Sequence, residues 1–169
     1  MAFDQQTRNR LQRFVSDARG LLAQECTRQL QNDYGIDPGT GEVSEVVRLQ
    51  HLDSTTRETA RVLREIIEHY KASSASGNII EAINRLVREQ AFTILNRFSA
   101  LRMAEARGII IESTAKGHTS KGFQLYHRLA GTALGETGDA YRCYILSLFD
   151  ELACDMPAFF DRYSPMGRI

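Results

Sequence analysis

The residues best suited to chemistry in this chain are charged and amide side chains set into one mainly apolar stretch. Asn96, Arg97, Arg102 and Glu105 all lie within Ile79–Arg107. Charges near a core must be paired, and Arg102 and Glu105 stand at the i, i+3 spacing of a helical ion pair. The spacing predicts a structural ion pair that closes the end of the core, with a binding role as the alternative. If Arg97 and Arg102 hold a core network, replacing Arg102 with Ala lowers the melting temperature by several degrees.

A second candidate site is the polar loop Ser113–Gly122, which contains His118 and two lysines. Its mixture of glycine, lysine and hydroxyl residues suggests a phosphate-binding loop, but the pattern G-x-x-x-x-G-K-[ST] is absent. We therefore predict a solvated loop, with contact to nucleic acid as the alternative. The candidate residues for structural, DNA or partner contacts are Asn96, Arg97, Arg102, Glu105, Lys116 and Lys121.

Acidic residues gather near the end of the chain, at Asp150, Glu151 and Asp155. Paired carboxylates serve acid–base catalysis or metal binding, but no histidine lies at ligand spacing. Carboxylates at a helix C-terminus oppose the helix dipole, so a partner is expected for the cluster. We predict no catalytic, metal-binding or cofactor-binding residue in this chain.

Three cysteines are far apart and form no CxxC pair, which argues against a disulfide framework and a zinc knuckle. The chain has no signal-like start and no apolar run long enough to span a membrane. Both features indicate a cytoplasmic protein without a membrane partner. Lysine and arginine total 21 and aspartate and glutamate total 21, so no net charge draws the whole chain to nucleic acid.

The stretch Gly35–Gly41, GIDPGTG, superficially resembles the glycine-rich cofactor loop of S-adenosylmethionine-dependent methyltransferases. That loop needs a buried strand before it and a helix directly behind it. A polar helix end, QNDY, precedes the glycines here. The stretch therefore predicts a plain turn between helices, with the cofactor loop as the lesser alternative.

Helical periodicity dominates the chain and predicts an all-α fold, a mostly helical bundle. At most one short β-like segment is expected, near Ile109–Glu112, and Glu42–Leu52 is either a short strand or a loose helical turn. We expect one domain over residues 1–169, with a flexible hinge near 73–77. The expected helices are Asp4–Tyr34, Asp53 or Ser54 to Ala72, Ile79–Arg107, Gly122–Leu129 and Asp139–Asp155, with a short turn from Pro157.

The helix Ile79–Arg107 is predicted to be the central one, because it carries apolar residues on two sides. One stripe consists of Ile80, Ile83, Val87, Ala91, Ile94, Phe98 and Leu101. On the opposite side are Phe92, Asn96 and Met103. This pattern predicts packing contacts on both faces.

Four strings together resemble a known family. They are NRFSALRMAEARG at Asn96–Gly108, ES at Glu112-Ser113, SKGFQLY at Ser120–Tyr126 and FDELACDMPAFFDRYSPMGRI at Phe149–Ile169. In this order they resemble the N-terminal helical region of large adenine-specific DNA methyltransferases of restriction–modification and BREX-like phage-defence systems. The resemblance covers the last two-fifths of the chain well and the first two helices only by position.

The resemblance implies a non-catalytic N-terminal domain, a piece of a longer protein, as the apolar and aromatic end of the chain also suggests. In the parent protein, S-adenosylmethionine is the expected cofactor, bound by a methyltransferase core with an (N/D/S)PP(Y/F) motif. That motif is absent here, since no two prolines are adjacent, and no nuclease PD…(D/E)xK pattern occurs. The implied partners are the core of the same chain, DNA and other defence-system proteins. The alternative is a self-contained helical interaction or dimerisation module.

Overall fold

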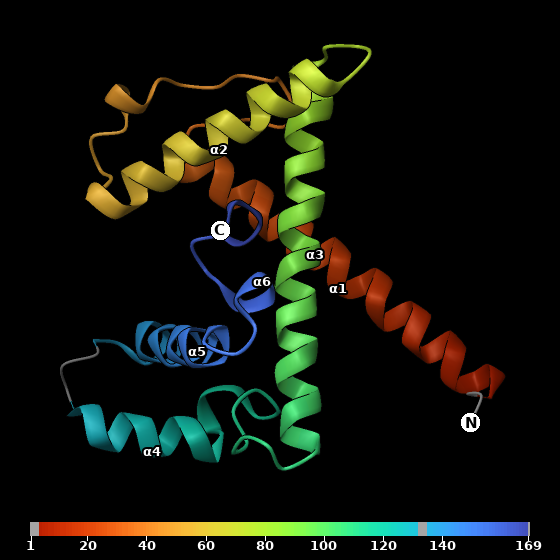
Figure 1. Cartoon of the computed structure of the whole chain (residues 1–169), viewed down its shortest axis with the longest axis vertical. Helices are drawn as coiled ribbons and strands as arrows, with labels where there is room; N and C mark the ends of the chain where they lie inside the picture. Colours follow the sequence, from red (N-terminus) through yellow and green to blue (C-terminus); the bar gives the residue numbers. More distant parts are fainter. Residues whose placement is uncertain (1–3, 132–134, 169) are drawn as a thin grey trace. The chain divides into compact units, whose positions relative to one another are not determined.

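The computed structural model describes residues 4–131 and 135–168, and within these ranges the chain is all-α, as predicted. The described part of the chain forms six α-helices and has no β-strand (Figure 1). Their bounds are α1 Gln5–Asn32, α2 Ser54–Ser73, α3 Ile79–Ala106, α4 Lys121–Ala130, α5 Thr137–Ala153 and α6 Pro157–Phe160. Three short 3₁₀ turns are described: η1 Val46–Arg48 lies between α1 and α2, η2 Gly117–Thr119 lies between α3 and α4, and η4 Pro165–Gly167 comes after α6. Among the described residues, no helix is both long and apolar enough to cross a bilayer.

The helix starts follow from capping residues that the sequence displays. Asp4 accepts a hydrogen bond from the backbone N–H of Thr7 at 2.6 Å, and Asp53 accepts one from Thr56 at 2.7 Å. Each carboxylate satisfies an N–H that the first helical turn leaves unpaired. Gly108 follows α3 with a φ of 68°, a left-handed conformation that favours glycine.

The chain divides into two compact units, which are described separately. Unit 1 comprises Met1–Leu95 and Pro165–Ile169, and unit 2 comprises Asn96–Ser164. The boundary falls inside α3, so this one helix supplies residues to both units.

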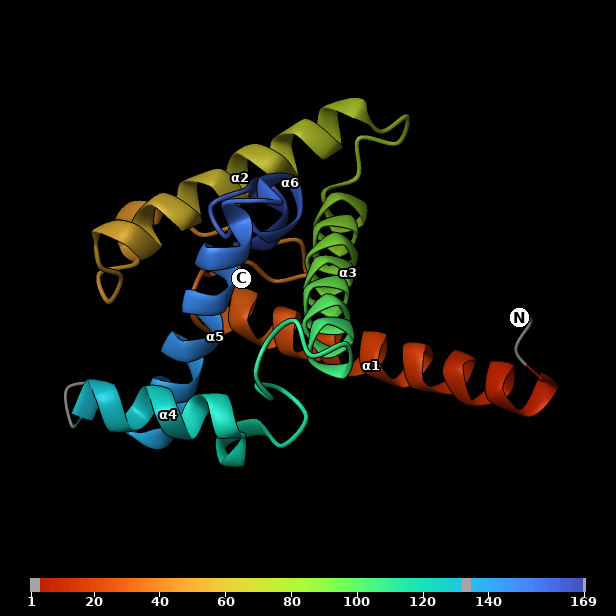
Figure 2. The ribbon, with the colours of Figure 1, turned by 60° about the horizontal axis from the view of Figure 1, so that its bottom comes forward.

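Unit 1 has an aliphatic core formed by the end of α1, one face of α2 and the first half of α3. Its most deeply buried side chains include Leu30, Ile36, Leu63, Ile67, Ile83 and Leu86. The burial of these side chains supplies most of the stabilisation, because apolar surface leaves water in proportion to its area. In Figure 2, the N-terminal half of α1 extends beyond α2 and the unit 1 part of α3.

The glycine-rich stretch of unit 1 is an inter-helix turn, as predicted. Asp37 accepts a hydrogen bond from the N–H of Gly39, and the N–H of Gly41 returns to the Asp37 carbonyl, both at 2.8 Å. An isolated β-bridge joins Ile36 to Val43 across it. A helix precedes this turn, and α2 begins only at Ser54, so the setting of a cofactor loop is missing.

Unit 2 packs the end of α3 against α4, α5 and α6 around aromatic rings. Its buried residues are Leu101, Phe123, Ala140, Tyr144, Ile145, Phe149 and Phe160. Phe123 meets Tyr141 edge-on at 5.2 Å between ring centroids, and Tyr126 lies 5.2 Å from Tyr144. Such ring pairs add to the stabilisation that burial alone provides.

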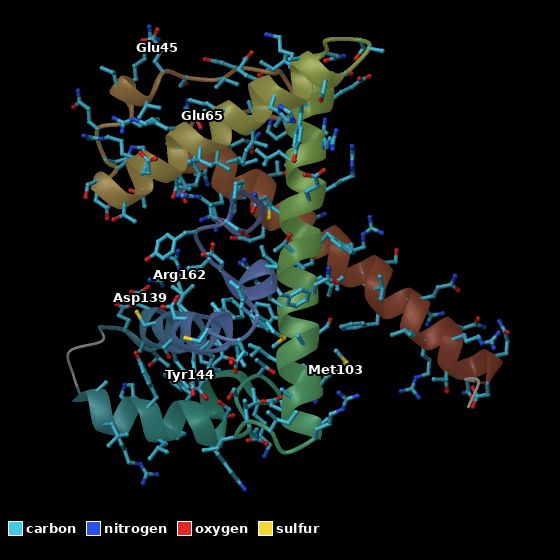
Figure 3. The ribbon with its side chains drawn as sticks, in the orientation of Figure 1. Glu45, Glu65, Met103, Asp139, Tyr144 and Arg162 are labelled. Carbon is cyan, nitrogen blue, oxygen red and sulfur yellow. The ribbon has the colours of Figure 1, made fainter. Side chains whose placement is uncertain are left out.

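One expectation about local structure is wrong. Phe92 and Met103 are more than half exposed, so the second apolar face of α3 is not covered in the described structure. In Figure 3, Met103 lies on the side of α3 away from α4 and α5. The one short β-like segment that the sequence allowed near Ile109–Glu112 does not form. The segment is a bend, because no neighbouring strand among the described residues offers it a hydrogen-bonding edge.

Candidate functional site

The predicted Arg102–Glu105 ion pair forms, and Glu105 is its buried member. The Glu105 side chain is 4% exposed, whereas Arg102 is 53% exposed. Arg102 donates to one carboxylate oxygen of Glu105. Glu105 extends the buried line of α3 that runs through Arg97 and Leu101, at the i, i+4 spacing of one helix face.

The Glu105 carboxylate holds the loop that follows α3. It accepts backbone N–H groups from Ser113, from Thr114 at 2.6 Å and from Ala115 at 3.3 Å, and the Thr114 hydroxyl donates to it at 3.0 Å. Three successive N–H groups thus converge on one side chain. In a bent segment these N–H groups have no backbone carbonyl to pair with, so the Glu105 carboxylate accepts their hydrogen bonds instead.

Two opposing effects set the pKa of Glu105. Burial raises it, but the N–H donors of Ser113 and Thr114, with Arg102, outweigh burial and lower the pKa from an ordinary value of 4.5 to about 2. The carboxylate is therefore ionised at neutral pH and its oxygens are already occupied by donors. A general base needs a free, basic oxygen, so Glu105 is suited to structure and not to proton transfer.

Ser113 of this loop and Tyr144 of α5 form a buried pair of hydroxyl groups. Ser113 Oγ lies 2.6 Å from Tyr144 Oη and 2.7 Å from the carbonyl oxygen of Ile111. A serine hydroxyl has one proton, which goes to the carbonyl, so Tyr144 must be the donor to Ser113. Burial raises the pKa of Tyr144, which keeps its hydroxyl protonated at neutral pH. Figure 3 places Tyr144 between α4 and α5.

Gly122 lets α4 approach this pair. Its N–H donates to the Glu112 carbonyl at 2.8 Å. A Cβ at this position would overlap the Tyr144 hydroxyl and lie 3.0 Å from the same carbonyl. Any side chain here would therefore displace α4 from the Ser113–Tyr144 pair.

Arg97 is the second buried charge of unit 2. Its side chain donates to the Phe159 carbonyl at 3.0 Å and to the Asp161 carbonyl at 2.7 Å, and its guanidinium lies 5.5 Å from the centre of the Phe149 ring. Burial lowers the pKa of Arg97, and the charge of Asp161 opposes that shift. Arg97 thus fastens the segment after α6 to α3.

The other candidate residues lie at the surface or near it. Asn96 is partly buried, while Lys116 and Lys121 are exposed. Lys116 pairs with Glu112 at 3.1 Å, which reduces its charge toward an external anion. One member of the acidic cluster, Asp150, has a partner in Arg162, which lies 3.1 Å from it. Within the described residues, no group of three or more potential ligand side chains could hold a metal ion.

The prediction of a solvated loop at Ser113–Gly122 is wrong at both ends of the segment. Ser113, Ser120 and Gly122 are buried, and only the middle of the segment faces solvent. Nothing in a single sequence distinguishes these serines from surface serines. The one available signal was Gly122 at the first position of the predicted helix Gly122–Leu129, since an isolated glycine in a helical pattern often has a packing reason.

No family model, no curated protein and no solved structure matches this chain. The resemblance carried by the four strings is therefore a prediction from those strings alone.

Proposed function

We propose that this chain is the non-catalytic N-terminal helical domain of a DNA adenine-N6 methyltransferase of a restriction–modification or phage-defence system. In this proposal it braces the methyltransferase core of the same protein. S-adenosylmethionine binds to that core and not to these helices. Contacts with DNA or with other defence proteins are part of the same proposal.

The observation that carries the proposal is where the four strings lie. All but the last five residues of the fourth string fall in unit 2. Within unit 2, the strings provide part of the buried network described above, whereas Tyr144 lies outside them. The members from the strings are Arg97, Leu101, Glu105, Ser113, Ser120, Gly122, Phe123, Phe149 and Phe160. Residues that pack against one another are expected to persist as a set, which supports reading the four strings as one structural signature.

An apolar groove on unit 2 supports the bracing role. It has a volume of about 370 Å³, and its lining includes Ile109, Ile111, Leu125 and Leu129, all of which are exposed large apolar residues. Contiguous apolar surface of this kind favours coverage by a protein neighbour. The occupant we propose is the methyltransferase core.

The first test uses the parent protein. The reading frame beyond Ile169 is expected to encode a glycine-rich cofactor loop and an (N/D/S)PP(Y/F) motif within a few hundred residues. The full protein is expected to transfer methyl groups from S-adenosylmethionine to adenine in duplex DNA, and Leu125→Glu with Leu129→Glu should weaken that activity or the stability of the core. An unrelated downstream domain would favour the self-contained interaction module instead.

The DNA contact has its own test. Binding of this chain to a labelled duplex is measured by fluorescence anisotropy while the salt concentration is raised. Contacts to phosphates release counterions, so binding should weaken steeply with salt. An absence of binding at low salt would remove DNA from the proposal and leave the bracing role.

A further inference from the structure

The outward side of α4 carries two cations on a helix that contains no acidic residue. Lys121, Gln124 and Arg128 recur at i, i+3 and i+7, so they form one line along the helix. All three side chains are exposed, and the buried residues Gly122 and Phe123 lie on the other side of α4. In Figure 1, α5 lies along one side of α4, and no other described helix of unit 2 covers the far side. We call this line of three residues the α4 cationic face.

Charge in unit 2 is divided between α4 and α5. Residues 113–131 contain three lysine or arginine residues and no acidic residue, whereas residues 135–164 contain six acidic and two basic residues, a net charge of −4. Lys116 pairs with Glu112 at 3.1 Å. Lys121 and Arg128 are in none of the ion pairs among the described residues. Unit 2 should therefore attract an external anion to α4 and repel it from α5.

We propose that the α4 cationic face contacts the phosphate backbone of duplex DNA. This inference rests on the proposed function, in which the parent protein acts on DNA, and it names the surface of this chain that meets the duplex. Lys121 and Arg128 stand roughly 10 Å apart along the helix axis, so they reach two different phosphates. Contacts to phosphates carry no sequence information, so this face positions the duplex and does not read its bases.

Gln124 joins the turn before α4 to the same surface. Its side-chain amide donates to the carbonyl of His118 at 2.9 Å, which holds the η2 turn beside the helix. A primary amide carries two N–H donors, so the second one is available to a phosphate oxygen. The η2 turn and the start of α4 thus form one continuous contact surface.

An anionic lipid surface is the main competing partner for these cations. A helix that lies on a membrane inserts apolar residues on the same side as its cations. The α4 cationic face contains no apolar residue, and the exposed leucines of α4, Leu125 and Leu129, line the apolar groove instead. The composition of this face therefore favours DNA over a membrane.

The salt dependence of DNA binding tests the proposed contact. Binding of the purified chain to a labelled duplex is measured by fluorescence anisotropy at several salt concentrations. Each phosphate contact contributes about 0.9 to the slope of the logarithm of the binding constant against the logarithm of the salt concentration. The double variant Lys121→Gln with Arg128→Gln should therefore lower the magnitude of this slope by about 2 and weaken binding at low salt at least about tenfold.

Two control variants separate contact from total charge. Arg57→Gln with Arg142→Gln removes two exposed cations from α2 and α5, and it should leave the slope unchanged. Lys121→Arg with Arg128→Lys keeps both charges and should keep the slope. Thermal unfolding checks that each variant folds.

Three outcomes would overturn the inference. They are an unchanged slope for Lys121→Gln with Arg128→Gln, no binding of the native chain to DNA at low salt, and binding to phosphatidylserine-containing vesicles without binding to the duplex. None of these outcomes bears on the methyltransferase motif downstream of Ile169 or on methyl transfer by the parent protein, which test the proposed function separately.

Discussion

The two units stabilise their non-helical segments by different kinds of interaction. In unit 1, the segment between α1 and α2 buries Ile36, Leu49 and Leu52 in an aliphatic core, and Arg64 donates to the carbonyls of Tyr34 and Ser44. In unit 2, the segment between α3 and α4 depends on one carboxylate, Glu105, which gathers N–H groups from three successive residues. The first solution relies mainly on buried area and the second on one charged group.

This difference predicts different tolerance. Apolar burial has no preferred direction, so a core of this kind accepts exchanges of similar volume at small cost. A buried carboxylate must keep its charge and its position, because its donors have no other partner in the same place. Unit 2 should therefore be the more sensitive to single substitutions and to acid.

The largest expected effect is that of Glu105→Ala. The substitution leaves the N–H groups of Ser113 to Ala115 without their acceptor and should cost about 3–5 kcal/mol of unfolding free energy, as for loss of one member of a buried charged network. Urea unfolding gives the free energy, and hydrogen exchange should show the amides of 113–115 losing protection. Glu58→Ala is the matched control, because its ion pair with Arg61 is exposed on both sides and should matter little. Equal effects of the two would contradict the role of Glu105.

Acid should act on the same group. The folded pKa of Glu105 is about 2, below its ordinary value of 4.5, so its contribution is complete above the unfolded pKa and is lost as pH falls toward 2. The loss amounts to about 3 kcal/mol over this window. Urea unfolding at neutral pH and in acid measures it. Glu105→Gln, which cannot titrate, should lose less stability over the same pH range than the native chain, and an equal loss would assign the acid sensitivity to other groups.

Gly122→Ala should have the next largest effect. The added methyl group overlaps the Tyr144 hydroxyl, and overpacking of this kind costs about 1–3 kcal/mol. Removing the hydroxyl with Tyr144→Phe in the same chain should recover part of the loss, because it removes the closest of the three neighbours of the new methyl group. Thermal unfolding of the two single variants and the double variant measures this coupling. Strictly additive losses would show that the methyl group and the hydroxyl do not meet.

Unit 1 provides the contrasting case in Ile36→Val. Ile36 is fully buried beside the inter-helix turn, and removing one methyl group costs about 0.5–1.5 kcal/mol. Hydrogen exchange should find the unit 2 amides at 113–115 unaffected. A loss of unfolding free energy as large as that of Glu105→Ala would show that the aliphatic segment is as sensitive to substitution as the polar one.

Periodicity and capping residues were sufficient to predict the helices but not the contacts between them. Asp4, Asp53 and Gly108 mark helix ends by local chemistry, so those ends could be predicted to within a residue or two. Which face of α3 is buried depends on distant residues, and for this reason Phe92 looked like a core residue and is exposed. The i, i+3 spacing identified the Arg102–Glu105 pair for the same local reason as the caps.

The rest of the candidate site lay beyond sequence reasoning because its partners are remote along the chain. Ser113 meets Tyr144 across 31 positions, and Arg97 reaches the Phe159 carbonyl across 62. Arginine and serine are usually exposed, so a single sequence gives no reason to bury these two. The order of importance within the predicted network also differs from expectation, since the buried groups are Arg97 and Glu105 and not Arg102.

The smallest effect in the series is therefore expected from Arg102→Ala, although the sequence alone predicts several degrees of lost thermal stability. The guanidinium of Arg102 is more than half exposed, so water and salt screen its attraction to Glu105, and Glu105 keeps its backbone donors when Arg102 is removed. An exposed partner of this kind contributes less than about 1 kcal/mol. Its contribution should shrink further in high salt, whereas the effect of Glu105→Ala should not. Differential scanning calorimetry at low and high salt compares the two variants, and a large, salt-independent effect of Arg102→Ala would mean that the ion pair itself, and not the N–H groups, holds the loop.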